Sequence, residues 1–281
     1  MKIAVSVEST CDLTKELLQK YDLKVIPFHI TLGEKMFLDG EITTTEMFDY
    51  VDKTGTLPKT NAINEFEYTE YFESIKKEYD AIIHISLSSG LSSSCANAKR
   101  AAQAMNNVFV IDSQSLSTGI GLLAIYASKL VEDGYAPSEI AEKVQARVAS
   151  VQASFVLERL DYLHKGGRCN LFTLLGATIL KIRPRIVVKN GKMGSDKKFK
   201  GNMGKVVRKY GESAFEDFNT PDLETCFITY TSATEEMLEE IRRIVSEKGF
   251  KNVYETRAGG TIASHCGANT LGVLYFNDGA K

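Results

Sequence analysis

The stretch Asp80-Ala-Ile-Ile-His-Ile-Ser-Leu-Ser-Ser-Gly-Leu-Ser-Ser-Ser-Cys-Ala-Asn-Ala98 decides how this sequence folds. Residues 81–85 are a short apolar run, which is typical of a buried strand. Serines and one glycine follow, and from about Ser92 alanines recur at helical spacing. A helix that begins after such a loop offers unpaired amides and a positive dipole end to an anion. One serine would be enough to cap the helix, so capping and anion binding both remain open here.

Composition excludes several classes of protein. A chain of 281 residues with 43% apolar and 25% charged residues is long enough for two globular domains. The net charge of −2 argues against a general nucleic-acid binder. We expect no membrane span, because no apolar run is long enough, and no signal peptide, because the first residues already have a strand pattern.

Cysteine and histidine usage points to a reducing compartment without a metal site. The five cysteines are scattered and odd in number, and the four histidines show no metal-ligand spacing. We therefore expect a cytoplasmic protein with neither a disulfide framework nor a bound metal. His84 lies within the apolar run and is expected to be a core residue.

The first part of the chain, residues 1–151, alternates strand and helix patterns. This alternation predicts a mostly parallel α/β sheet with polar residues gathered at the carboxyl ends of its strands. Ser9 and Thr10 follow the first strand, as ligand contacts or as turn residues. Residues 24–40 alternate like a β-ribbon inserted into this domain. Residues 57–64 have no regular period and are predicted to form a polar loop.

The second part, residues 152–281, predicts an α+β domain. Asn190-Gly191 is a strong hairpin signal, and residues 225–256 have a βαβ-like pattern. Residues 164–169 are interpreted as a flexible basic loop, residues 171–182 as a helix, and residues 259–267 as a small, polar segment. The ligand site is expected between the two domains.

Lysine and arginine dominate residues 181–209, where Asp196 is the single acid. Such a run is usually a solvated face. The alternative is a docking patch for an acidic partner or a phosphorylated ligand.

Two chemical hypotheses follow from the residues alone. Ser92, His265 and Asp112 would provide the groups of a serine hydrolase or esterase, although Gly90-Leu91-Ser92-Ser93-Ser94 is not the G-x-S-x-G of a nucleophile elbow. A serine and glycine loop at a helix start also suits a phosphosugar-binding protein. Neither a P-loop nor a dinucleotide fingerprint is present.

Six segments, in this order and at these separations, resemble the DegV family of bacterial fatty-acid-binding proteins, whose better-characterised members are lipid-binding subunits of fatty acid kinase. The resemblance covers essentially the whole chain. The segments are Glu8-Ser9-Thr10-Cys11-Asp12-Leu13, Pro58-Lys59-Thr60-Asn61, Ser88-Ser89-x-Leu91-Ser92, Asp112-Ser113, Tyr162-Leu163-x-Lys165-Gly166-Gly167-Arg168, and the glycine-rich segment that holds His265.

The resemblance implies a ligand and a set of residues that hold it. Thr60 and Ser92 match the family residues whose hydroxyls hold a fatty acid carboxylate, and Arg168 and His265 match residues near the acid head. Asn61 and Ser93 complete the expected binding set. The acyl tail, such as that of palmitate, would lie in an apolar tunnel in the region of the second domain, residues 152–281, between the two domains.

The sequence departs from the family pattern at four positions. Glu8 stands where an aspartate is usual, and Asn61 where a serine is usual. Ser93, with the serine after it, replaces a Gly-Thr pair. These three departures bear on how tightly the head group is held. Lys200 stands near an expected arginine and bears on the docking of a kinase partner.

The physics of such a ligand is consistent with a carrier. A buried carboxylate needs several donors, which two hydroxyls, a helix start and a basic side chain would supply. A tail of about sixteen carbons, at roughly 0.8 kcal/mol per buried CH₂, contributes on the order of 10 kcal/mol before ordering costs. We therefore expect a non-catalytic, cytoplasmic long-chain fatty-acid-binding protein without a cofactor. The resemblance implies that a separate ATP-dependent kinase, docking near residues 181–209, phosphorylates the bound acid.

Overall fold

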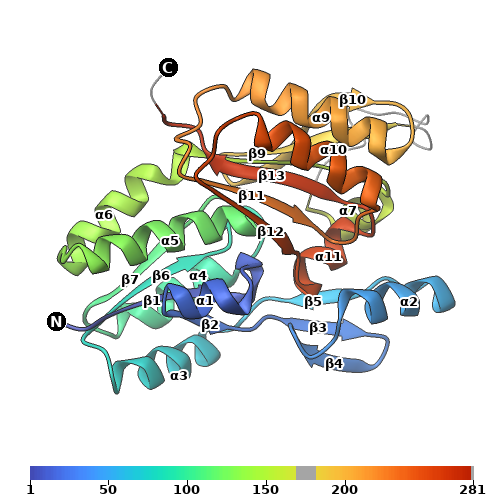
Figure 1. The fold of residues 1–281 in the computed structure, drawn as a ribbon. Coiled ribbons are helices and arrows are strands. Elements are labelled where there is room, and N and C mark those ends of the chain that lie inside the picture. The colour runs from blue at the N-terminus through green and yellow to red at the C-terminus, as the bar shows by residue number, and fades with distance from the viewer. Residues whose placement is uncertain (169–181, 280–281) are drawn as a thin grey trace.

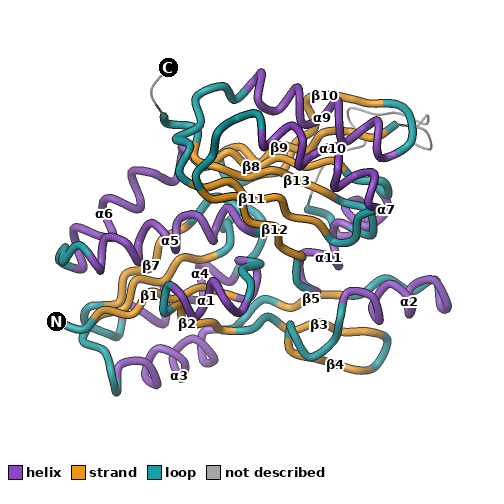
Figure 2. Tube along the Cα trace, in the orientation of Figure 1, coloured by secondary structure: helices purple, strands orange, loops and turns teal. Residues whose placement is uncertain are grey.

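The computed structural model describes residues 1–168 and 182–279, and it places the strands in three sheets (Figure 1). Figure 2 shows the same trace with strands and helices alternating along the chain. The predicted α/β class is confirmed. Among the described residues, no helix combines the length and apolar character that crossing a membrane requires.

The first sheet has four parallel strands in the order β2-β1-β6-β7. Its strands are β1 (Ile3–Glu8), β2 (Leu23–Ile26), β6 (Ala81–Ser86) and β7 (Val108–Asp112). Its helices are η1 (Ser9–Cys11), α1 (Lys15–Lys20), α3 (Glu65–Lys76), α4 (Ser94–Gln103), α5 (Thr118–Glu132), α6 (Pro137–Arg147) and η2 (Val148–Ser150). The expected parallel sheet is present, and His84 is fully buried in it.

The β-ribbon is shorter than the sequence pattern indicated. Because β2 pairs in parallel with β1 through α1, residues 23–26 belong to a βαβ unit, and the ribbon begins at His29. Antiparallel pairing joins β3 (His29–Leu32) to both β4 (Lys35–Leu38) and β5 (Lys59–Asn61), and α2 (Thr44–Thr54) lies between β4 and β5 in the chain. The loop expected at residues 57–64 therefore contains a strand, which is too short to show a period.

The second sheet has six strands in the order β10-β9-β8-β13-β11-β12. They are β8 (Val151–Val156), β9 (Arg183–Lys189), β10 (Lys192–Phe199), β11 (Thr225–Tyr230), β12 (Asn252–Arg257) and β13 (Leu271–Phe276). The Asn190-Gly191 hairpin and the parallel β11–β12 pair agree with the predictions.

Four described helices accompany the second sheet. They are α7 (Asp161–Gly166), α9 (Met203–Asp217), α10 (Glu235–Ser246) and α11 (Gly260–Cys266). Residues 164–166, expected in a flexible loop, are thus helical, and so is most of the glycine-rich segment 259–267. The helix expected at 171–182 falls, up to residue 181, outside the described residues.

Helix α5 joins the two larger sheets. It contacts β1 and β6 on one side and β8, β11 and β13 on the other, and Figure 1 shows it lying between the sheets. Most of its residues are buried, since a helix that is apolar all round can be covered on every side. Near its start, a methyl group added at Gly121 would lie 2.6 Å from Leu13, so the glycine permits this close packing.

The basic run is not simply a solvated face. Arg185 is 1% exposed and forms ion pairs with Asp196 at 2.5 Å and Asp217 at 2.6 Å. Lys197 also pairs with Asp217, at 2.7 Å. These pairs fasten the β9–β10 hairpin to α9, so part of the charge that the sequence suggested for docking is neutralised within the fold.

Candidate functional site

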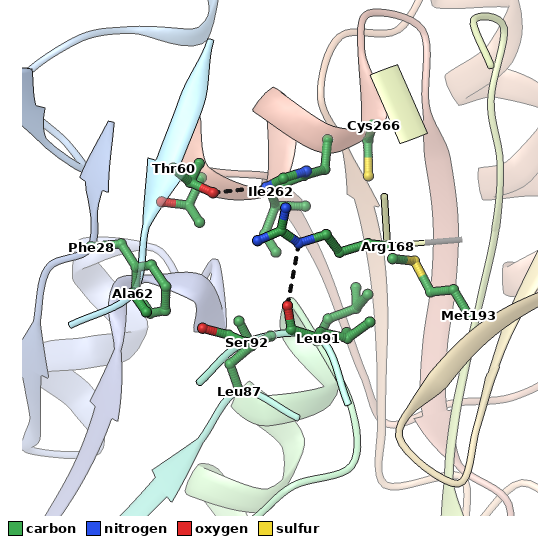
Figure 3. A pocket seen from close by; sticks show the side chains of 13 residues that line it. Phe28, Thr60, Ala62, Leu87, Leu91, Ser92, Arg168, Met193, Ile262 and Cys266 are labelled. Carbon is green, nitrogen blue, oxygen red and sulfur yellow. Dashed lines mark hydrogen bonds between the residues drawn. The ribbon is translucent and has the colours of Figure 1, made fainter. Parts of the chain in front are cut away.

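A narrow, largely apolar cavity of about 50 Å³ lies where the first sheet, β5, α11 and the β9–β10 hairpin meet. Thr60, Ser92, Arg168 and His265 all line it, although they come from segments far apart in the sequence (Figure 3). The remaining lining residues are Phe28, Ala62, Leu87, Leu91, Leu116, Met193, Thr261, Ile262 and Cys266. Polar groups thus converge on an apolar hollow.

Thr60 and His265 form the central polar contact. The Thr60 hydroxyl lies 2.8 Å from His265 Nε2, and the dashed line in Figure 3 marks this bond between β5 and α11. Burial, and secondarily the Arg168 guanidinium, lower the pKa of His265 from 6.5 to about 4. The imidazole is therefore neutral at pH 7.

The surroundings of the other imidazole nitrogen, Nδ1, determine which tautomer His265 adopts. His265 Nδ1 is buried and has no hydrogen-bond partner among the described residues. A buried ring N–H without an acceptor costs more free energy than a buried ring nitrogen whose lone pair has no donor. The proton therefore belongs on Nε2, which donates to Thr60 Oγ1, and the Thr60 hydroxyl hydrogen is free to donate to a ligand.

Most serines of the loop after β6 have structural partners. Ser88 Oγ donates to the Gly191 carbonyl at 2.7 Å, and Ser89 Oγ donates to Asp112 at 2.5 Å. Ser94 Oγ accepts the Ile63 amide at 3.1 Å. Ser92 also bonds within the loop, since its Oγ accepts the Ser94 amide at 3.2 Å and donates to Ser94 Oγ at 3.3 Å. It is nevertheless the loop serine that lines the cavity.

The buried carboxylate of Glu8 anchors the start of this loop. It accepts hydrogen bonds from Tyr68 and Ser86 hydroxyls and from the Leu87 amide. Burial opposes its ionisation, but His84 and these donors outweigh burial and lower the pKa of Glu8. An ionised Glu8 thus fixes the backbone from which the Ser92 loop departs.

Arg168 brings a cation beside the hydroxyls. Its Nη1 donates to the Gly166 carbonyl at 2.6 Å, and its Nε donates to the Leu91 carbonyl at 3.4 Å. In Figure 3 its guanidinium lies in the space between Thr60 and Leu91. The side chain connects the end of α7 with the serine loop.

Two of the six predicted binding residues lie away from this cavity. Asn61 is exposed, and its amide donates to the Thr31 hydroxyl at 3.3 Å. Ser93 is exposed at the start of α4 and is not among the residues that line the cavity. Asn61 instead lines a neighbouring open cleft.

An open cleft of about 530 Å³ adjoins the Thr60–His265 pair. Thr60, Arg168 and His265 line both the cleft and the cavity. Lys59 and Lys165 add two exposed cations to the cleft. Thr60, Arg168 and His265 thus lie where an apolar hollow adjoins a basic, solvent-accessible one.

A second apolar cavity, of about 30 Å³, lies deeper, against the second sheet. It shares Leu116, Ile262 and Cys266 with the first cavity. Sequence reasoning missed these apolar lining residues. One signal was available, because Leu91 and Ile262 are isolated large apolar residues within runs of serine, glycine and threonine.

The geometry does not assemble the hydrolase triad. Asp112 accepts hydrogen bonds from Ser89 and from the Gln114 amide, and His265 bonds to Thr60 instead of Ser92. Within the described residues, the His265 imidazole therefore has no orienting carboxylate and no bond to a serine nucleophile.

The resemblance seen in the sequence is confirmed by comparison with known proteins. The family model described as "Uncharacterised protein, DegV family" matches residues 2–278. The chain belongs to the DegV family. A DegV domain-containing protein of Clostridium perfringens is 30% identical over 222 residues, which are 78% of each chain.

Solved DegV structures share this fold. A DegV family protein of Thermus thermophilus, described by its fatty acid binding, matches with a TM-score of 0.90 at 24% identity, over 98% of this chain and 99% of its own. DegV of Bacillus subtilis, described as a fatty acid binding protein, matches with a TM-score of 0.85 at 26% identity, over 98% and 99% of the two chains.

Proposed function

We propose that this DegV family member binds a long-chain fatty acid, with its carboxylate between Thr60 and Ser92. The observation that carries the proposal is the position of both hydroxyls in one apolar cavity. Fatty acid binding by the Bacillus subtilis relative supports the ligand class. The site lies between two proposed domains, residues 1–151 and 152–281.

The head group would receive hydrogen bonds and a positive charge. His265 Nε2 donates its proton to Thr60 Oγ1. The hydroxyl hydrogen of Thr60 would therefore be donated to the carboxylate. Ser92 supplies a second hydroxyl, and Arg168 a charged donor. Charge-assisted hydrogen bonds of this kind offset the cost of burying a carboxylate. Asn61 and Ser93 have weaker support, because neither lines the cavity.

The tail would extend from the first cavity into the second. Leu116, Ile262 and Cys266 line both, so small movements of these side chains would join them into one apolar channel. At roughly 0.8 kcal/mol per buried CH₂, tail burial would dominate the affinity. The apolar lining supports a lipid over a phosphosugar.

A non-catalytic carrier would present the carboxylate to a partner enzyme. The basic cleft, which Thr60 and His265 also line, would provide access to the head group. We propose that an ATP-dependent fatty acid kinase docks here and near residues 181–209, where Lys189, Lys192 and Lys200 are exposed. The protein itself needs no cofactor in this scheme, and we propose the cytoplasm as its location.

Native mass spectrometry of the purified protein tests the proposal. We expect a bound fatty acid, uptake of added palmitate, and palmitate affinity reduced about tenfold in each of Thr60→Ala and Ser92→Ala, since each removes one hydrogen bond to a charged group. Ser93→Ala is the matched control from the same loop and should retain wild-type affinity. No uptake of palmitate or oleate would contradict the function, and unchanged affinity in the T60A/S92A double variant would contradict the site.

The same preparation separates the rival functions. An esterase would hydrolyse a panel of esters and lose that activity on Ser92→Ala. A phosphosugar-binding protein would be stabilised against heat by sugar phosphates and not by fatty acids. We expect neither behaviour.

A further inference from the structure

The amides at the start of α11 are held by two carboxylates that come from the first part of the chain. Asp39, just after β4, accepts the Gly260 amide on Oδ1 at 2.8 Å and the Thr261 amide on Oδ2 at 3.3 Å. Asp12, just after η1, accepts the Gly259 amide at 2.7 Å. The helix that carries His265 is thus fastened across more than 200 residues of sequence.

Each carboxylate is itself held by a serine. Ser9 Oγ donates to Asp39 Oδ2 at 2.9 Å. Ser9 Oγ also accepts the Phe28 amide at 3.1 Å. Ser117 Oγ donates to Asp12 Oδ2 at 2.5 Å. Phe28 lines the first cavity and Ser117 the second, so the two carboxylates connect both cavities to α11.

The Gly259-Gly260 pair allows this close approach. A methyl group added at Gly259 would lie 3.1 Å from Asp39 Oδ1 and 3.3 Å from Asp12 Oδ1. One added at Gly260 would overlap the end of the Ile30 side chain. A side chain at Gly259 would require the two carboxylates to shift by a few tenths of an ångström, and one at Gly260 would require the Ile30 side chain to move. The two glycines let α11 lie at this distance without those shifts.

We propose that Asp39, assisted by Asp12, is a positioning residue that sets α11 so that His265 meets Thr60 and orients its hydroxyl toward a ligand. The α11 placement stands on the contacts alone, whereas the effect on a ligand rests on the proposed fatty-acid binding. Neither carboxylate lines the first cavity, so each acts through the helix.

Asp39 should matter more than Asp12. Its two oxygens together accept two backbone amides and one hydroxyl, so an asparagine there would turn an NH₂ group toward at least one donor. Asparagine at position 12 can keep its oxygen on the Gly259 amide, because the Ser117 hydroxyl can rotate and accept from the new NH₂ group. Asp39→Asn is therefore the sharper test.

The first readout needs no ligand. Nitrogen-15 NMR of the ligand-free protein measures the chemical shift of His265 Nε2, which depends on the hydrogen bond to Thr60. We expect Asp39→Asn to shift this signal, Asp12→Asn to shift it less, and Asp133→Asn, on an exposed carboxylate after α5, to leave it unchanged. A wild-type signal in D39N, with the fold intact by circular dichroism, would overturn the positioning role.

The second readout is a double-mutant cycle on palmitate affinity. We expect D39N to weaken palmitate binding about tenfold in the wild-type background and less than about twofold in the His265→Ala background, because the effect passes through the imidazole. Equal losses in both backgrounds would mean that Asp39 only supports the fold, and would overturn the proposal. If the wild-type protein failed to bind palmitate, the proposed function would fail while the NMR test of Asp39 would still stand.

Discussion

Gly166 leaves the space that the His265 imidazole occupies. A methyl group added at Gly166 would lie 2.5 Å from His265 Nδ1, although the backbone there does not itself require glycine. Gly166→Ala should therefore turn the imidazole away from Thr60 and weaken palmitate binding about tenfold, the value of one hydrogen bond to a charged group.

The control for this variant lies in β10. A methyl group at Gly194 meets nothing within 4 Å, so Gly194→Ala should leave affinity unchanged. Isothermal titration with palmitate measures both variants. Equal affinities for G166A and wild type would show that the position of the imidazole does not govern the head group.

His265 also gives the fold a definite pH dependence. Its pKa is about 4 in the folded protein, because burial and Arg168 disfavour the charged form, against 6.5 in a free side chain. The unfolded chain therefore binds more protons between these values, so the stability that depends on neutral His265 is complete above about pH 6.5 and falls as pH falls toward about 4. At pH 4.5 the loss is about 2.5 kcal/mol.

Urea unfolding at pH 7 and pH 4.5 measures this loss. The variant His265→Asn lacks the titrating group and should lose about 2.5 kcal/mol less than wild type over the same range. Identical pH profiles for the two proteins would mean that another group carries the acid sensitivity.

At the scale of single elements, sequence patterns predicted the helices and strands whose positions depend on residues close in the sequence. The strand and helix predicted around residues 80–98 appear as β6 and α4. In the structure, Thr14, Thr43 and Asn64 cap α1, α2 and α3, and each accepts the amide of the residue three positions on. Capping depends on neighbours three residues away, so the sequence is sufficient for it. Thr60 and Ser92, predicted as one site, do line one cavity.

Elements fixed by distant partners were not predictable in this way. Strand β5 has three residues and exists because β3 pairs with it. The serines at the end of β6 and in the loop after it were interpreted as a possible anion cradle, yet Ser88 bonds to Gly191 and Ser86 to Glu8. The short helix α11 starts at glycines, and its carboxylate caps lie in another part of the chain.

At the scale of the whole molecule, the proposed tail channel runs from the polar head site toward the second sheet. Its near part lies beside Thr60 and Ser92, whereas its far part is lined by β-strand residues such as Ala153 and Phe155. Affinity should therefore rise with acyl length by roughly 0.8 kcal/mol per CH₂ and level off once the tail has filled the far cavity. A series of saturated acids from decanoate upward measures this dependence.

One substitution in the far cavity distinguishes the contribution of the acyl tail to affinity from that of the head group. Ala258 lines the second cavity but not the first, and it is 4% exposed. Ala258→Leu should fill space that only a long tail needs, weakening palmitate about tenfold while changing decanoate less than about twofold. Thermal unfolding checks for overpacking, which costs about 1–3 kcal/mol in a close-packed site. Equal losses for both acids would place the tail elsewhere, because a channel through this cavity must distinguish a ligand that reaches it from one that does not.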